Sequence, residues 1–176
     1  NNLKKKITYQ DIGFSIGPLI NSSGRIAKAN DVVELFLSQN DDKIDKILNK
    51  MNTHNVTRKK IEQENLDLID FKKYNSKNII FIFNKKFHEG VIGILAAKLS
   101  KIFNKPCFIM TESHNLLKCS IRSANNVKIN KTINKLIANK LIISGGGHDE
   151  AGGFSAEKEY LSYIEEFLNN EYRTLK

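Results

Sequence analysis

Hydrophobic residues in the second half of the chain form alternating strand-sized and helix-sized segments. Short apolar runs predict strands at residues 79–83, 107–110, 117–122 and 151–155. Helical spacing of apolar residues predicts helices at residues 90–103, 129–137 and 156–168. A turn at 113–115 joins two of the strands, which favours an antiparallel hairpin. The pattern therefore predicts an α/β domain with a mixed sheet.

The first half of the chain carries a different pattern. Residues 1–25 are rich in glycine and serine and contain Pro18, which predicts an irregular, turn-rich segment. A short helix is predicted from residue 26 to about residue 37, and Asn40-Asp41-Asp42 interrupts it and caps the next helix. Apolar residues share one face over residues 42–73, which predicts one long helix or two helices end to end. The charged opposite face is typical of a helical connector, and the pattern changes near residue 75.

Composition narrows the class of protein. The chain has 28 basic and 19 acidic residues and a net charge of +9, which favours a polyanionic partner. Lys, Asn and Ile are also what an AT-rich genome encodes, so the charge alone does not decide between a nucleic-acid partner and a coding bias. No apolar run approaches the roughly 18 residues of a membrane span, so we expect no membrane association and a cytoplasmic protein. Cys107 and Cys119 stand in apolar surroundings, which predicts buried thiols in a reducing compartment.

The run Gly145-Gly146-Gly147-His148 is the most informative local feature. Three glycines remove side chains, permit positive φ and let a ligand approach the backbone, whose N–H groups can cradle a phosphate. His148 adds a hydrogen-bond donor. The alternative is a flexible surface loop. The run is no P-loop, because no Gly-Lys-Ser or Gly-Lys-Thr follows.

Two other segments carry candidate phosphate contacts. Ser120, Arg122 and Ser123 stand at the end of a predicted strand, where Ser120 and Arg122 share a face and a guanidinium flanked by hydroxyls can clamp a phosphate. An exposed ion pair is the alternative for Arg122. Asn21 and Arg25 lie in a polar segment that either fixes a phosphate or simply leads into a helix. His, Asp and Glu show no spacing typical of a metal site, so we expect no metal bound by this chain and no catalytic residue on it.

Four ordered motifs resemble one family. They are Gly17-Pro18-Leu19-Ile20-Asn21-Ser22-Ser23-Gly24-Arg25, the segment 88–99 that begins His88-Glu89-Gly90, the segment Cys119-Ser120-Ile121-Arg122-Ser123, and the glycine-rich segment 145–154. Together they are similar to the C-terminal part of the RecJ family, single-stranded-DNA-specific exonucleases of the DHH phosphoesterase superfamily. Leu19 departs from the family signature, which has Arg at that position.

The resemblance implies a domain organisation and a function. Residues 1–25 would be the tail of a DHH catalytic domain, 26–74 connecting helices, and 75–176 a DHH-associated substrate-binding domain. The complete enzyme would hydrolyse single-stranded DNA from the 5′ end in DNA repair and recombination, with Mn²⁺ or Mg²⁺ held by an N-terminal DHH domain. That domain and single-stranded DNA would be the partners. The implied nucleic-acid-binding residues are Asn21, Arg25, Ser120, Arg122, Ser123, Gly145, Gly146, Gly147 and His148.

Two alternatives stay open at this point. The chain is either a non-catalytic single-strand binder or decayed fragment, or part of a nano-RNase-type oligonucleotide phosphoesterase. The sequence signature followed by about fifty helical residues favours RecJ over the second of these.

Overall fold

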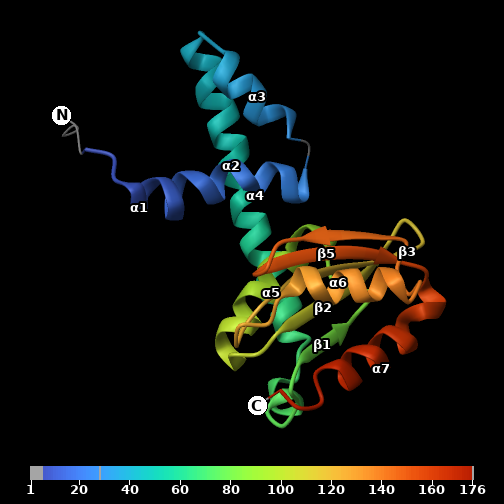
Figure 1. Cartoon of the computed structure of the whole chain (residues 1–176). Helices are drawn as coiled ribbons and strands as arrows, with labels where there is room; N and C mark the ends of the chain where they lie inside the picture. The colour runs from blue at the N-terminus through green and yellow to red at the C-terminus, as the bar shows by residue number, and fades with distance from the viewer. Residues whose placement is uncertain (1–5, 28, 176) are drawn as a thin grey trace. The chain divides into compact units, whose positions relative to one another are not determined.

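The computed structural model describes residues 6–27 and 29–175 (Figure 1). The chain forms two compact units, of which the first ends at Ile61 and the second begins at Glu62. Within the residues that the structure describes, no helix combines the length and apolar character needed to cross a lipid bilayer.

Among the described residues the first unit is helical from Tyr9 to Ile26, so the prediction of an irregular segment at 1–25 is wrong for residues 9–25. The helices are α1 (Tyr9–Asp11), a π-helical segment η1 (Ile12–Ile16) and α2 (Gly17–Ile26). Thr8 starts α1 through a capping box with Asp11, whose backbone N–H donates to Thr8 Oγ1 at 3.2 Å. Pro18 lies in the first turn of α2, where a missing N–H costs nothing. The turn-forming residues were therefore compatible with a capped helix.

Two further helices follow. The predicted helix from residue 26 to about residue 37 is correct only in its second part, α3 (Asn30–Leu37). Asn40 caps the next helix as predicted, because its Oδ1 accepts from the backbone N–H of Lys43 at 2.9 Å. That helix, α4 (Asp41–Asp67), is continuous, and a 3₁₀ turn η2 (Phe71–Tyr74) follows it. Met51 is the fully buried residue of α4, and its carbonyl accepts from Ser22 Oγ of α2 at 3.4 Å.

The second unit contains a mixed sheet, as the sequence predicted, but with five strands where four were predicted. The strands are β1 (Ile80–Phe83), β2 (Cys107–Ser113), β3 (Leu116–Arg122), β4 (Ser144–Gly147) and β5 (Ala151–Ala156). Their order is β1-β2-β3-β5-β4, and only the β1–β2 pair is parallel. The predicted hairpin is β2–β3, whose tight turn places His114 and Asn115 at φ 50° and 64°. The glycine run, which is not among the predicted strands, forms the edge strand β4.

Helices cover both faces of this sheet (Figure 1). The helix α5 (Glu89–Phe103) packs on β2 and β3 and buries Leu95 and Leu99 completely. On the other face, α6 (Ile129–Ala138) and α7 (Leu161–Glu171) form a continuous core with the strands. The predicted last helix begins later than residue 156, because a 3₁₀ turn η3 (Lys158–Tyr160) precedes α7.

Strands β1, β2, β3 and β5 each have an end at the same edge of the sheet. The register aligns Ile80, Cys107, Arg122 and Ala151 across β1, β2, β3 and β5. The strands β1, β2 and β5 begin at this end and β3 ends there, so the connection from α5 to β2 and the connection from β3 to α6 both lie beside it.

Candidate functional site

A cavity of about 710 Å³ lies at this end of the sheet. The last turns of α5, the end of β3, residues 124–128 and the β4–β5 turn line it. Arg122, Ser123 and His148 are all among the lining residues. The structure therefore brings together three residues that the sequence singled out from two separate motifs.

The β4–β5 turn fixes the orientation of His148. Its backbone N–H donates to the carbonyl of Ala151 at 2.9 Å, which closes the turn. The backbone N–H of Glu150 donates to His148 Nδ1 at 3.3 Å. A neutral imidazole that accepts at Nδ1 carries its hydrogen on Nε2. His148 can therefore donate a hydrogen bond from Nε2.

Arg122 supplies the cavity with a guanidinium from the last position of β3. One nitrogen, Nη1, donates to the carbonyl of Ile121 at 2.9 Å, which holds the side chain close to its own strand. A guanidinium has five N–H donors, so several stay available for the two oxygens of a phosphate. The side chain is half-buried, as the alternation along β3 predicted.

Ser123 stabilises the segments that form the cavity. Its backbone N–H donates to the carbonyl of Glu150 at 2.8 Å, and its hydroxyl donates to the carbonyl of Val127. Its own carbonyl accepts from Ser100 Oγ of α5 at 2.8 Å. These bonds tie the end of β3 to the β4–β5 turn, to α5 and to the segment before α6. The Ser123 hydroxyl is thus already used as a donor.

Charged groups of both signs surround the cavity. Lys101 and Lys128 line it together with Arg122, and Asp149 and Glu150 line it from the turn. Lys128 Nζ lies 3.2 Å from Asp149 Oδ2, which offsets one of the carboxylates. The amino end of α6 also faces this region, since the Ile129 N–H donates to the Asp149 carbonyl at 3.0 Å. No pattern in the sequence singles out Lys101, which reaches the cavity because it lies in the last turn of α5.

The glycines of the run have different structural roles. A Cβ at Gly145 would lie within 3.0 Å of Phe154, Ile133 and Ile142, so this glycine is required by the packing of α6 on the sheet. A Cβ at Gly147 would lie 2.4 Å from the Ala151 carbonyl oxygen, inside the turn. A Cβ at Gly146 would meet nothing within 4 Å. No described glycine has a positive φ, so the freedom that these glycines permit is not used, and close packing is what requires glycine at Gly145 and Gly147.

Outside the glycine run, three of the predicted binding residues do not line the cavity of Arg122 and His148. They are Ser120, Asn21 and Arg25. Ser120 shares its face of β3 with Arg122 but packs under α5, with its Oγ 3.2 Å from where a Cβ of Gly93 would stand. Asn21 and Arg25 line a different cavity of about 440 Å³ between α2 and α3 in the first unit. The second unit alone therefore unites Arg122, Ser123 and His148.

Histidine and cysteine side chains take structural roles outside the cavity. His88 caps α5, since its Nδ1 accepts from the Gly90 N–H at 3.1 Å. His54 Nδ1 forms a hydrogen bond with Ser23 Oγ at 3.2 Å. Cys107 and Cys119 are free thiols, and burial raises the pKa of both. The described ranges contain no group of three or more His, Cys, Asp or Glu placed to hold a metal ion.

Comparison with known proteins identifies relatives that match most of this chain. A family model described as the DHHA1 domain matches residues 75–174. The single-stranded-DNA-specific exonuclease RecJ of Escherichia coli is 28% identical over 169 residues, which cover 90% of this chain and 29% of that protein. The chain thus spans under a third of the length of this relative.

Solved structures share the fold. RecJ from Thermus thermophilus in complex with Mn²⁺ has a TM-score of 0.85 at 20% identity, over 94% of this chain and 25% of that one. The same enzyme in complex with Mg²⁺ gives a TM-score of 0.80 at 21% identity, over 94% and 26% of the two chains.

Proposed function

The chain belongs to the DHHA1 domain family, and we propose that it is the substrate-gripping part of a RecJ-like exonuclease that degrades single-stranded DNA from its 5′ end. The observation that carries the proposal is the shared cavity of Arg122, Ser123 and His148. The names of the curated relatives support the same substrate. Such an enzyme acts in DNA repair and recombination in the cytoplasm.

Arg122 and His148 would hold a phosphate of the strand. The guanidinium presents parallel N–H groups that match two phosphate oxygens. Nε2–H of His148 donates to a third oxygen or to a base edge. Ser123 keeps these two donors in place, because its three hydrogen bonds join their supporting segments. Lys101 and Lys128 add attraction that depends on salt.

The hydrolytic step would belong to a DHH catalytic domain. The described residues of this chain do not form a site for Mn²⁺ or Mg²⁺, so we assign the metal to that domain. We propose that residues 1–25 are its tail, that residues 26–74 connect it, and that residues 75–176 are the DHH-associated domain. Asn21 and Arg25 would then contact the strand or its phosphate from the catalytic side.

A binding titration tests whether Arg122 and His148 bind single-stranded DNA. Fluorescence anisotropy with a labelled single-stranded oligonucleotide should show Arg122→Ala and His148→Ala each weakening binding. A lost charge-assisted hydrogen bond costs about 1.5–3 kcal/mol, which is roughly 10- to 150-fold in affinity for Arg122→Ala. Lys85→Ala is the matched control, because Lys85 follows β1 at the opposite end of the sheet and is exposed. Equal losses for Arg122→Ala and Lys85→Ala would show that only net charge matters.

A reconstitution tests the reaction. The chain mixed in equal amounts with the DHH domain of a RecJ relative should release mononucleotides from single-stranded DNA in the presence of Mn²⁺. The Arg122→Ala variant in the same mixture should release them more slowly. Absence of release by the wild-type mixture, or faster cleavage of di- to pentaribonucleotides than of DNA, would contradict the proposed function.

A further inference from the structure

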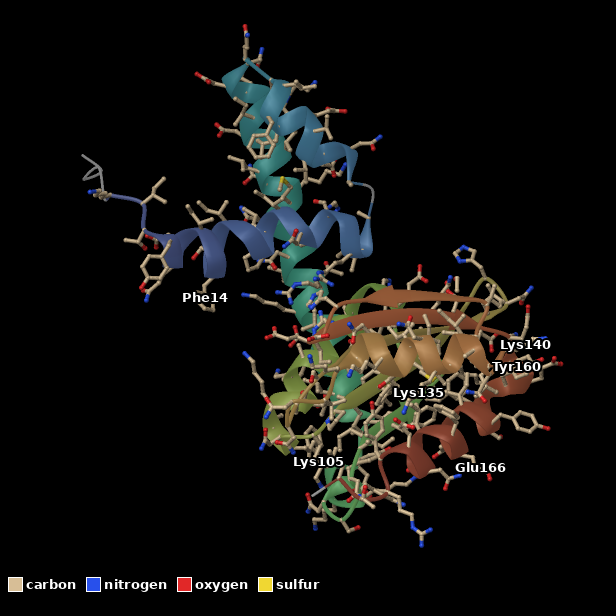
Figure 2. The ribbon with its side chains drawn as sticks, viewed as in Figure 1. Phe14, Lys105, Lys135, Lys140, Tyr160 and Glu166 are labelled. Atoms are coloured by element: carbon tan, nitrogen blue, oxygen red, sulfur yellow. The ribbon has the colours of Figure 1, made fainter. Side chains whose placement is uncertain are left out.

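A second polar cavity, of about 410 Å³, lies at the same end of the sheet. Residues 75–78, which precede β1, form one side, and the segment Phe103, Asn104 and Lys105 after α5 forms the other. Its volume lies within the range of roughly 300–1,000 Å³ that small-molecule sites occupy. Figure 2 shows Lys105 at this end of the unit, and its Nζ donates to the carbonyl of Asn75 at 2.7 Å.

This cavity adjoins the cavity of Arg122 and His148. Asn125 lines both. Its backbone is left-handed, at φ 53°, and its Nδ2 donates to the carbonyl of Asn104 at 2.9 Å. The bond holds the segment after β3 against the end of α5. A single loop therefore forms a wall of both cavities.

The chemistry of the second cavity suits a nucleotide with its base. Phe103 offers an aromatic ring, which is held by stacking on Phe71 at 5.9 Å between centroids and by the edge of Tyr74 at 6.4 Å. Lys77 and Lys105 supply positive charge, and no acidic side chain is among the described lining residues.

Several side chains here have unused hydrogen-bonding capacity. Within the described part of the chain, the side chains of Ser76, Lys77 and Asn104 make no hydrogen bond or ion pair. An amide such as that of Asn104 both donates and accepts, so it can pair with the edges of different bases. Unstacked bases of single strands are held by such a combination of an aromatic ring and polar edges.

We propose that this cavity is a second subsite that takes a base, with its phosphate, of the same single strand. The inference rests on the proposed function and extends it, because it makes affinity depend on strand length and on the presence of a base at a defined distance from Arg122. Phe103 stacks the base, Asn104 and Ser76 hydrogen-bond it, and Lys77 attracts the phosphate.

Strand length separates the two subsites. Anisotropy titrations of the full chain would use thymidine oligonucleotides from two to eight nucleotides long. Lys77→Gln should leave dinucleotide binding unchanged and weaken binding of the longest strand about two- to fivefold. Lys85→Gln, which removes the same charge at the far end of the sheet, should change neither. Equal effects of the two variants on the long strand, or an equal loss of dinucleotide binding in Lys77→Gln, would overturn the subsite.

Removal of single bases tests the stacking directly. In the wild-type chain, one abasic position in the long strand should lower affinity about fivefold or more when it falls at the second cavity. Phe103→Leu should abolish this position dependence. If no abasic position matters in the wild-type chain while Arg122→Ala still abolishes binding, the subsite is refuted and the grip stands. If no wild-type oligonucleotide binds at all, the proposed function fails and the subsite fails with it.

Discussion

The three glycines of β4 should respond very differently to the same substitution. A Cβ at Gly147 would stand 2.4 Å from the carbonyl oxygen of Ala151 and 2.5 Å from the Cα of Gly152. Both neighbours are backbone atoms of a closed turn, so neither can rotate away. At Gly146 a Cβ meets nothing within 4 Å, and its φ is not in the left-handed region. Alanine should therefore fit at Gly146 and disturb the turn at Gly147.

The magnitudes follow from these contacts. Overpacking of a tight site costs about 1–3 kcal/mol, which we expect for Gly147→Ala. Gly146→Ala should stabilise by about 0.4–1 kcal/mol, because alanine loses less backbone entropy on folding. In a chain of this size, 1 kcal/mol shifts Tm by roughly 2–4 °C, so the two variants should differ in Tm by about 3 °C or more.

Urea and thermal unfolding of the wild-type chain and the two variants measure this difference. NMR peak intensities of the second unit report its unfolding separately from that of the first unit. Matching midpoints for Gly146→Ala and Gly147→Ala, or a larger loss for Gly146→Ala, would refute the reasoning that close packing requires glycine only at some positions of the run.

Three further outcomes are expected from single side chains. Lys140, at φ 56° just after α6, carries the strain of a left-handed residue, so Lys140→Gly should raise the free energy of unfolding by about 1 kcal/mol in urea titrations, and an unchanged midpoint would count against it. His88→Ala should remove the cap of α5 and cost about 0.5–2 kcal/mol, whereas His88→Asn should restore most of it in the same assay. Burial raises the pKa of the Cys107 and Cys119 thiols, so a disulfide reagent at pH 8 should label neither until the chain unfolds; rapid labelling of the folded chain would contradict their burial. Because the fold keeps these thiols protonated, their contribution to stability should be full below about pH 8.5 and fall as pH rises above it.

The strands and helices of the second unit could be predicted because their apolar residues repeat at regular spacing. The run at 79–83 and the hairpin 107–122 have both length and period, and the structure confirms them. The strand Ser144–Gly147 could not be predicted in this way, because glycine has no side chain that contributes to a period. Only the pairing with β5 and the close packing of α6 reveal it.

The prediction of an irregular segment over the first 25 residues was wrong for a related reason. Glycine, serine and proline are typical of turns, but Thr8 and Pro18 occupy positions where a helix begins. Local capping thus outweighed composition.

The sequence could indicate individual residues of the candidate site, but it could not predict which of them lie together in one cavity. Arg122 and His148 stood out because an arginine at a strand end and a histidine after glycines are chemically informative. Their common cavity depends on β3 pairing with β5, which joins positions 122 and 151. Alternation and the motif of residues 119–123 both grouped Ser120 with Arg122, but Ser120 packs under α5. The residues 75–78 and 103–105 gave no signal, because they become a cavity only when β1 and β2 start side by side.

Amide chemical-shift mapping tests the central claim most directly. A single-stranded oligonucleotide titrated into the labelled chain should shift the amides of residues 122–128 and 148–151 first, since they surround the guanidinium of Arg122 and the imidazole of His148. Shifts confined to the surface of α7, with those segments unmoved at saturation, would contradict it.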